Sequence, residues 1–277
     1  MQIRTTLITG CTTGIGYETA KGLAEAGQNL ILVARSQKKL TNLEAELNQL
    51  NNSIKIKSYL CDFADLRQTL TVAKKIALEN PDLDILLNNA GTWESKLNLT
   101  SDGLELTWVV NYFAMYLFTE TLFPNLKKRV VATKDVRIII LSSEAHRQGK
   151  FDFENIFKFG FQKTYSDTKL ADLMYGFQLA KRLKDSGITV NMIHPGVIAT
   201  GLWRKLPQPF AWIMSKVLAS PVEGAKTSIY LATLSELKET GKYWAKSKVK
   251  ATTEYSLDEA IQEKLMEFTK AKVAGIK

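Results

Sequence analysis

Cysteine and histidine are scarce in this chain of 277 residues, which has two of each. Cys11 and Cys61 are too few and too far apart for a disulfide framework, so we expect two reduced thiols near strand ends. His146 and His194 give little support for a histidine-based metal centre, and the two cysteines add none. The sequence therefore predicts a protein without a bound metal.

Long apolar runs are also missing. No stretch approaches the roughly 20 apolar residues that a helix needs to span a bilayer. The beginning of the chain lacks a basic start followed by a long apolar segment and a small-residue cleavage site. We therefore expect an intracellular, cytoplasmic and unprocessed protein with no transmembrane segment.

The net charge of +9 at pH 7 would suit nucleic acid or an anionic membrane. However, the basic residues are spread along the chain, with modest clusters over residues 127–129 and 242–250. No basic block is interleaved with aromatic residues in the way that nucleic-acid-binding modules show. We expect no nucleic-acid partner and interpret the charge as solvated faces together with a site for one anionic cofactor.

Hydrophobic residues make up 45% of the chain and occur in short β-branched runs that alternate with longer amphipathic segments. We expect strands over residues 5–9, 29–34, 54–60, 83–87, 136–141 and 188–193, with a seventh near 241–244. Helical patterns follow over residues 15–26, 38–49, 66–78, 104–122, 166–183 and 222–232. Continuous apolar strands separated by helices favour a parallel sheet covered on both faces. The predicted fold class is α/β, a single-domain (1–277) Rossmann-type doubly wound parallel sheet of about seven strands.

One irregular region interrupts this alternation. Residues 201–220 hold Pro207 and Pro209, are followed by Pro221, and carry bulky apolar side chains such as Trp203, Phe210 and Trp212. This is more apolar surface than a plain surface loop carries. We expect a helical flap over an apolar substrate, which leaves peripheral membrane contact open. The alternative is a helix packed into the core.

A glycine-rich segment joins the first strand to the first helix. Glycines allow a tight turn and close approach to a pyrophosphate, and the helix N-terminus offers free N–H groups. Its spacing, Gly-x₃-Gly-x-Gly, differs from the commoner Gly-x-Gly-x₂-Gly dinucleotide fingerprint. The alternative is a tight turn without a ligand. The residues expected to bind the pyrophosphate are Gly10, Thr12, Thr13, Gly14, Ile15 and Gly16.

The end of the second strand indicates which dinucleotide binds. An acidic residue there would bind the adenosine ribose and repel a 2′-phosphate. This chain instead has Arg35, followed closely by Lys38 and Lys39. A guanidinium can hold the phosphate through charge-assisted hydrogen bonds and can stack on adenine. We therefore predict NADP(H), the alternative being that Arg35 is solvated at a helix start.

Tyr165 and Lys169 lie four residues apart, hence on one face of a helix. An ammonium about 4 Å from a phenolate supplies about 4 kcal/mol at an effective dielectric of 20, enough to make a tyrosine a proton donor near neutrality. Tyr17 and Lys21 share this spacing, so spacing alone cannot choose. Tyr17 follows the phosphate loop, whereas Tyr165 follows the fifth strand and can face the nicotinamide. We expect a packing role for Tyr17.

Two serines, Ser142 and Ser143, end the fifth strand, where open α/β sheets bind ligands. A hydroxyl there can donate to a substrate carbonyl as negative charge develops on it. A helix cap or turn serine is an equally good interpretation.

Together these residues resemble the classical short-chain dehydrogenase/reductase family. The similarity extends to a branch that contains retinol dehydrogenases, WW-domain oxidoreductases and protochlorophyllide reductases. The matching segments appear in family order and cover nearly the whole chain: Thr9-Gly10-x₃-Gly14-Ile15-Gly16, Asp62, Asn88-Asn89-Ala90-Gly91, Asn111, Ser142-Ser143, Tyr165-x₃-Lys169 and Pro195-Gly196-x₃-Thr200.

The resemblance implies catalytic roles for four residues. Tyr165 is the general acid of reduction or the general base of oxidation. Lys169 stabilises its phenolate and binds the nicotinamide ribose. Ser143 polarises the carbonyl, and Asn111 helps to hold a water-linked proton relay.

The resemblance also implies further cofactor contacts. Asp62 and Phe63 would lie at the adenine, and the segment after the fourth strand at the adenosine side. Asn88 would stabilise the sheet. The residues implied beyond the glycine-rich loop are Asp62, Phe63, Asn89, Ala90, Gly91, Pro195, Gly196, Ile198 and Thr200.

The resemblance and the predicted apolar flap define the expected function. We expect an NADPH-dependent oxidoreductase that interconverts a lipophilic aldehyde or ketone, retinal-like in character, and its alcohol. The alternative is a non-catalytic NADP(H)-binding sensor or scaffold on the same fold. A serine hydrolase is disfavoured because the Gly-x-Ser-x-Gly elbow is missing. The resemblance also implies a homodimer or homotetramer, and the phenylalanines of residues 151–161 predict an added apolar wall.

Overall fold

The computed structural model describes residues 3–196 and 220–276, which contain one eight-stranded sheet. Its order is β3-β2-β1-β4-β5-β6-β7-β8, with parallel pairing except between β7 and β8. The predicted doubly wound parallel sheet is confirmed, and β8 adds two antiparallel residues to the seven strands expected. The strands are β1 (Thr5–Thr9), β2 (Asn29–Ala34), β3 (Ile56–Leu60), β4 (Leu83–Asn88), β5 (Val136–Leu141), β6 (Ile188–His194), β7 (Lys242–Ala245) and β8 (Lys248–Val249).

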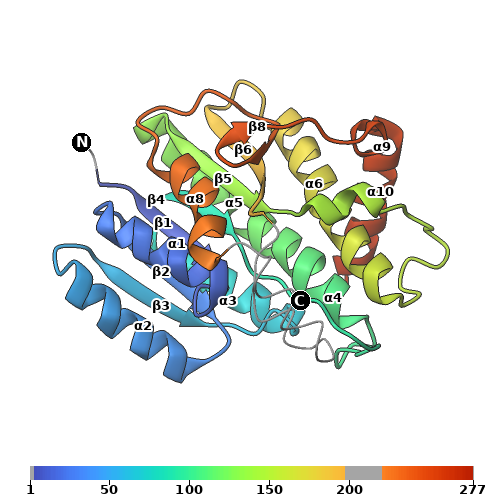
Figure 1. Ribbon diagram of the computed structural model, residues 1–277, viewed down its shortest axis with the longest axis horizontal. Coiled ribbons are helices and arrows are strands. Elements are labelled where there is room, and N and C mark those ends of the chain that lie inside the picture. The colour runs from blue at the N-terminus through green and yellow to red at the C-terminus, as the bar shows by residue number, and fades with distance from the viewer. Residues whose placement is uncertain (1–2, 197–219, 277) are drawn as a thin grey trace.

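Helices cover both faces of the sheet (Figure 1). One face carries α1 (Gly14–Glu25), α2 (Gln37–Leu50) and α8 (Pro221–Thr233). The other carries α3 (Leu66–Glu79), α5 (Ala114–Thr133) and α6 (Phe161–Arg182). The remaining elements are α4 (Leu106–Trp108), the π-helical turn η1 (Val109–Phe113), the 3₁₀ turn η2 (Glu144–Gln148), α9 (Glu254–Leu257) and α10 (Glu259–Val273).

The central strands are apolar on both sides because each side faces a helical layer. In β1, Leu7 packs into the core on the α5 and α6 side, whereas its neighbour Ile8 packs into the core on the α1 and α8 side. Both side chains are fully buried. Successive residues of a strand point to opposite faces, so a strand between two layers reads as a continuous apolar run.

Two predicted helix boundaries were wrong. The helix expected over residues 104–122 is divided into α4, η1 and α5, and α5 continues past Pro124 to Thr133. It continues because Leu126 and Val130 are buried and extend the apolar face. The helix expected from residue 166 begins at Phe161, one turn earlier, so Tyr165 lies inside α6 and not at its start.

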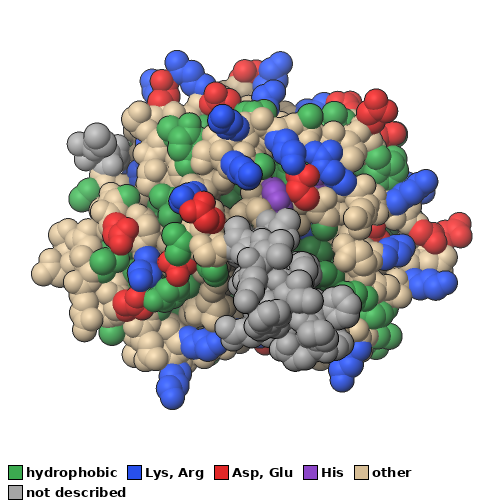
Figure 2. Space-filling view, viewed as in Figure 1, with side chains coloured by type: hydrophobic (Ala, Val, Ile, Leu, Met, Phe, Trp, Pro, Cys, Tyr) green, Lys and Arg blue, Asp and Glu red, His purple; other side chains and the backbone are tan. Residues whose placement is uncertain are grey.

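Charged side chains of both signs are spread over the surface of the described residues. Lys and Arg side chains are scattered among acidic ones over the face that Figure 2 shows. Within residues 3–196 and 220–276, no helix is long and apolar enough to cross a bilayer. The predicted flap over residues 201–220 lies outside the described residues apart from Ser220.

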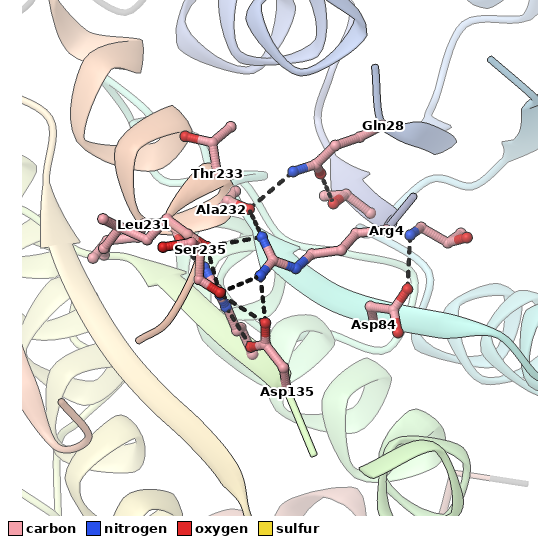
Figure 3. A network of polar contacts seen from close by, with 12 residues as sticks. Arg4, Gln28, Asp84, Asp135, Leu231, Ala232, Thr233 and Ser235 are labelled. Carbon is pink, nitrogen blue, oxygen red and sulfur yellow. Dashed lines mark hydrogen bonds and ion pairs between the residues drawn. The ribbon is translucent and has the colours of Figure 1, made fainter. Parts of the chain in front are cut away.

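At the amino edge of the sheet, two arginines bind the C-terminal end of α8 (Figure 3). Arg137 is fully buried and donates to Leu231 O at 2.6 Å and to Leu234 O at 2.7 Å. Arg4 donates to Leu234 O at 2.8 Å, and both guanidinium groups pair with Asp135. These bonds satisfy carbonyls that the end of a helix leaves without intrahelical partners. They fix α8 at the edge opposite the carboxyl ends of the strands.

Candidate active site

The carboxyl ends of β1, β4, β5 and β6 lie at one edge of the sheet, and the sequence-predicted residues follow these ends. The order of the strands reverses between β1 and β4, since β2 and β3 extend to one side and β5 and β6 to the other. Ligands of doubly wound sheets bind at such a switch point. The topology therefore brings the glycine-rich loop and the predicted catalytic residues to the same edge.

The glycine-rich loop is closely packed against the segment after β4. Gly10 has φ +66°, and a Cβ there would lie 2.8 Å from Ala90 Cα. A Cβ on Gly16 would clash with Gly10 O and with the side-chain nitrogen of Asn89. Glycine is thus required at both positions by backbone conformation or by close approach. Thr13 precedes α1 without a side-chain capping bond, so the first N–H groups of α1 keep their capacity to bind a phosphate.

Asn89 ties the β4 segment to the loop. Its Nδ2 donates to Thr9 O at 2.8 Å and to Gly10 O at 3.1 Å. Its Oδ1 is buried and has no hydrogen-bond partner within the described residues. A buried orphan acceptor at this edge fits a dinucleotide whose hydroxyl groups can donate to it. Asn88 donates instead to Thr119 Oγ1 at 2.9 Å and joins β4 to α5.

The predicted adenosine end lies after β2 and β3. Arg35 follows β2 with an exposed side chain. Asp62 follows β3 and accepts the N–H of Ala64 at 3.0 Å. Phe63 is buried and packs edge-on against Phe118, with 5.4 Å between ring centroids, so its ring belongs to the core.

Lys169 is almost completely buried, with 4% of its surface exposed. Its Nζ donates to Leu141 O at 2.9 Å and to the Asp172 carboxylate at 2.8 Å. Burial lowers the pKa of Lys169, but the charge of Asp172 and the Tyr165 phenol outweigh burial, so the pKa lies above its usual value. Lys169 is therefore a fixed positive charge at the end of β5.

Tyr165 lies one turn before Lys169 on α6 and is partly exposed among buried neighbours. The indole of Trp93, from the segment after β4, stacks on its ring. Phe161, at the start of α6, also stacks on Trp93. Of the phenylalanines expected to form an apolar wall, Phe161 thus joins the aromatic cluster that includes Tyr165. Phe153 and Phe157 pack instead against Phe268 of α10.

Ser143 precedes η2 and is partly exposed. Its Oγ accepts the N–H of Ala145 at 3.2 Å, which is the helix-cap role that sequence offered as one alternative. A hydroxyl that accepts one bond can still donate its own proton, so the cap leaves Ser143 able to bind a carbonyl oxygen. Ser142 is buried and donates to Lys169 O at 2.7 Å, which holds α6 against the end of β5.

Asn111 lies within the π turn η1, a type of turn that occurs often at functional sites. Its Oδ1 accepts the Thr92 N–H at 2.6 Å, and its Nδ2 donates to Thr92 O at 2.9 Å and to Thr168 Oγ1 at 3.0 Å. The side chain therefore joins the β4 segment to α6 beside Lys169. This occupies the amide, so any contribution of Asn111 to a proton relay falls to its backbone.

A charged network behind Ser143 was not predicted. Glu144 accepts hydrogen bonds from Tyr243 Oη and Lys250 Nζ, each at 2.9 Å, and pairs with Arg147. Burial raises the pKa of Glu144, but these donors outweigh it and hold the pKa at about 2. His194 accepts the Glu144 N–H at 3.2 Å, and burial lowers its pKa to about 4. The neutral imidazole and the carboxylate together fix the turn that carries Ser143.

The remaining predicted residues lie at or beyond the end of β6. Pro195 and Gly196 follow His194 directly and are half-buried at the same edge. Ile198 and Thr200 lie outside the described residues. Trp93, Asp172 and Glu144 are the residues at this site that sequence reasoning missed. A signal existed for Asp172, which lies three residues after Lys169 and hence on the same helix face.

Comparison with known proteins gives a consistent result. The profile of the short chain dehydrogenase family matches residues 4–209. Retinol dehydrogenase 13 of Mus musculus is 34% identical over 278 residues, covering 95% of this chain and 81% of that protein.

Solved structures are similar as well. L-sorbose reductase from Gluconobacter frateurii, complexed with NADPH and L-sorbose, has a TM-score of 0.71 at 23% identity, over 88% of this chain and 95% of that one. The Pseudomonas aeruginosa RhlG/NADP complex has a TM-score of 0.72 at 25% identity, over 87% of this chain and 94% of that one.

Proposed function

This chain belongs to the short-chain dehydrogenase family of oxidoreductases acting on CH–OH/C=O groups, and we propose that it uses NADPH to interconvert a lipophilic aldehyde or ketone and its alcohol. The observation that carries the proposal is that Ser143 follows β5 directly and that Lys169 Nζ donates to Leu141 O at the end of β5, with Tyr165 near enough to act on the charge of Lys169. In the direction of reduction, Tyr165 is the proton donor.

Tyr165, Lys169 and Ser143 have separate roles at the carbonyl oxygen. The bound dinucleotide supplies a hydride to the carbonyl carbon. The Tyr165 hydroxyl gives its proton to the oxygen, and the resulting phenolate is stabilised by the Lys169 ammonium. Ser143 donates a hydrogen bond to the same oxygen, where negative charge develops. In alcohol oxidation, the Tyr165 phenolate takes up the hydroxyl proton.

The choice of NADPH rests on the adenosine end. Arg35 presents an exposed guanidinium where an acidic residue would bind the ribose hydroxyls of NAD. L-sorbose reductase and RhlG, whose folds this chain shares, were solved with NADPH and NADP. A cationic side chain at this position favours the additional phosphate of NADP.

The lipophilic character of the substrate is supported by two features. Trp93 and Phe161 place an aromatic surface beside the Tyr165 ring. The relative named retinol dehydrogenase points to an apolar alcohol. The proposed substrate class is therefore a retinal-like or long-chain carbonyl compound. The homodimer or homotetramer and the flap over residues 201–220 stay predictions.

The test compares two tyrosines that each have a lysine four residues later. NADPH consumption is followed with retinal and with decanal for wild type, Tyr165→Phe and Tyr17→Phe. Tyr165→Phe is expected to lower kcat at least about 100-fold, as for the loss of a general acid, while NADPH still binds. Tyr17 donates to Glu46 at 2.5 Å, away from the carbonyl site, and its variant should keep wild-type turnover.

Full turnover by Tyr165→Phe would contradict the proposal. Tight NADPH binding by wild type without turnover on either carbonyl compound would favour the sensor alternative.

A further inference from the structure

Asp172 is a carboxylate that lies deep beside the proposed catalytic lysine. It is one turn beyond Lys169 on α6, and its Oδ2 lies 2.8 Å from Lys169 Nζ. The two side chains are 2% and 5% exposed. The other carboxylate oxygen, Oδ1, is buried without a hydrogen-bond partner in the described part of the chain. A buried carboxylate with one oxygen that accepts no hydrogen bond lowers the stability of the folded protein. Packing alone therefore gives no reason for an acidic residue at this position.

The hydrogen bonds of Lys169 show where its charge is held. Two of its three N–H groups are directed to Leu141 O and to Asp172. The space next to Gly91 adjoins the ammonium, because a Cβ there would lie 3.7 Å from Nζ and 3.4 Å from Asn111 Oδ1. Asp172 and Leu141 O therefore hold the ammonium through two of its N–H groups, and the third is directed to neither of them.

The other titratable groups near Asp172 leave Lys169 as its main electrostatic partner. Tyr112 of η1 is fully buried and hydrogen-bonded to Thr269 of α10, and burial raises the pKa of this phenol well above its usual value, so Tyr112 stays neutral. On α6 itself, Lys169 acts electrostatically on Asp172, and Tyr165 acts on Lys169. Burial raises the pKa of Tyr175, one turn further along α6, well above its usual value, and this phenol donates to Glu120. Burial raises the pKa of Asp172 to about 6 although Lys169 opposes this. Near neutrality the carboxylate is therefore charged and offsets part of the field that the ammonium exerts on Tyr165.

We propose that Asp172 is a positioning residue that sets the pH at which Tyr165 exchanges its proton, because it holds the Lys169 ammonium in place and offsets part of its charge. This inference rests on the proposed function of Tyr165 and Lys169. When the negative charge is removed, the pKa of Lys169 falls, but over the pH range in which Lys169 keeps its proton the ammonium stabilises the Tyr165 phenolate more strongly. The phenolate then forms at lower pH, and alcohol oxidation, which requires the phenolate, becomes active at lower pH.

The test is the pH profile of Asp172→Asn. This variant keeps an oxygen that can accept the Lys169 N–H and removes only the charge. We expect the acidic limb of kcat/KM for retinol or decanol oxidation with NADP⁺ to move down by roughly one pH unit. The matched control is Asp167→Asn on the same helix. Asp167 is equally buried but accepts the Lys150 N–H at 2.9 Å and pairs with Lys163, so its variant should keep the wild-type profile.

A second measurement separates this inference from the proposed function. The ultraviolet tyrosinate signal of wild type minus that of Tyr165→Phe reports ionisation of Tyr165 without any turnover. If wild type is inactive on every carbonyl compound and alcohol, the proposed function fails, yet Asp172→Asn must still shift this titration to lower pH. An unchanged titration, or a shift to higher pH, would overturn the role of Asp172.

Folding of the variant is checked independently. Thermal unfolding and NADPH binding of Asp172→Asn are compared with wild type. If Asp172→Asn does not fold, Asp172→Ser removes the same charge with a smaller side chain and must move the Tyr165 titration in the same direction. A purely structural role would change the unfolding temperature and leave the pH profile in place.

Discussion

The indole of Trp93 lies nearly parallel to the phenol ring of Tyr165, with 4.9 Å between ring centroids and 21° between the planes. Phe161 also stacks on Trp93, with 4.6 Å between ring centroids and 13° between the planes, and Trp93 Nε1 donates to Phe161 O at 2.8 Å. Trp93 comes from the segment after β4, whereas Phe161 and Tyr165 belong to the first two turns of α6. The orientation of the Tyr165 ring is thus set by two segments far apart in sequence.

We therefore expect Trp93→Leu to lower kcat for carbonyl reduction by about tenfold, because a proton donor that is no longer held in one orientation reacts less often. The loss of two aromatic stacks should also cost about 1–3 kcal/mol of unfolding free energy. Trp93→Phe keeps a ring in the stack and is the matched control, expected within about threefold of wild-type kcat. An unchanged kcat in Trp93→Leu would show that the stack does not position Tyr165.

Arg35 should control the preference between the two dinucleotides. Arg35→Asp replaces a phosphate-binding cation by a ribose-binding carboxylate that repels the phosphate. We expect the KM for NADPH to rise at least about tenfold, as for the loss of a charge-assisted hydrogen bond, and the KM for NADH to fall. Lys39→Asp, which makes the same charge change at a nearby exposed residue, is the control and should have a smaller effect. Equal KM changes for both dinucleotides would rule out phosphate recognition by Arg35.

His194 should make the protein less stable in acid. Its pKa is lowered by burial from 6.5 to about 4, so the unfolded chain binds this proton more readily than the folded one. The resulting stability is present above pH 6.5 and is lost as the pH falls through about 4. We expect the unfolding temperature of wild type to drop between pH 7 and pH 4 by more than that of His194→Asn. An asparagine oxygen can still accept the Glu144 N–H, so a parallel drop in both proteins would exclude His194 as the cause.

Arg137 should matter for stability and not for cofactor binding. Its guanidinium is fully buried and satisfies Leu231 O and Leu234 O, far from the site edge. We expect Arg137→Ala to cost about 1–3 kcal/mol of unfolding free energy, because Leu231 O loses its buried side-chain donor, whereas Leu234 O and Asp135 keep Arg4 as a partner. Arg67→Ala breaks an exposed ion pair with Asp102 and should cost less than about 1 kcal/mol. NADPH affinity of the folded protein should be unchanged in both variants.

Local patterns in the sequence were sufficient to predict the sheet and the approximate ends of most strands. Short β-branched apolar runs alternate with longer amphipathic segments, and this alternation indicates buried parallel strands with helices on both faces of the sheet. The glycines at 10 and 16 similarly indicated a loop where the backbone must turn and pack closely. Helix boundaries were harder, because the π turn at Asn111 and the start of α6 at Phe161 depend on contacts with other segments.

The sequence by itself determined the fold class. It also predicted Tyr165 and Lys169 as the proton-transfer pair, because their place after the fifth strand, and not their spacing, distinguishes them from Tyr17 and Lys21. Only the tertiary structure decided what surrounds them. Trp93, which contacts Tyr165, comes from the segment after β4, more than 70 residues earlier in the chain. Lys250, which pairs with Glu144, follows β8, more than 100 residues later. Periodicity records which face of an element is buried, but not which partner from a distant element covers it. That choice is made by packing, which is why the sequence could propose a proton donor but not the side chains that surround it.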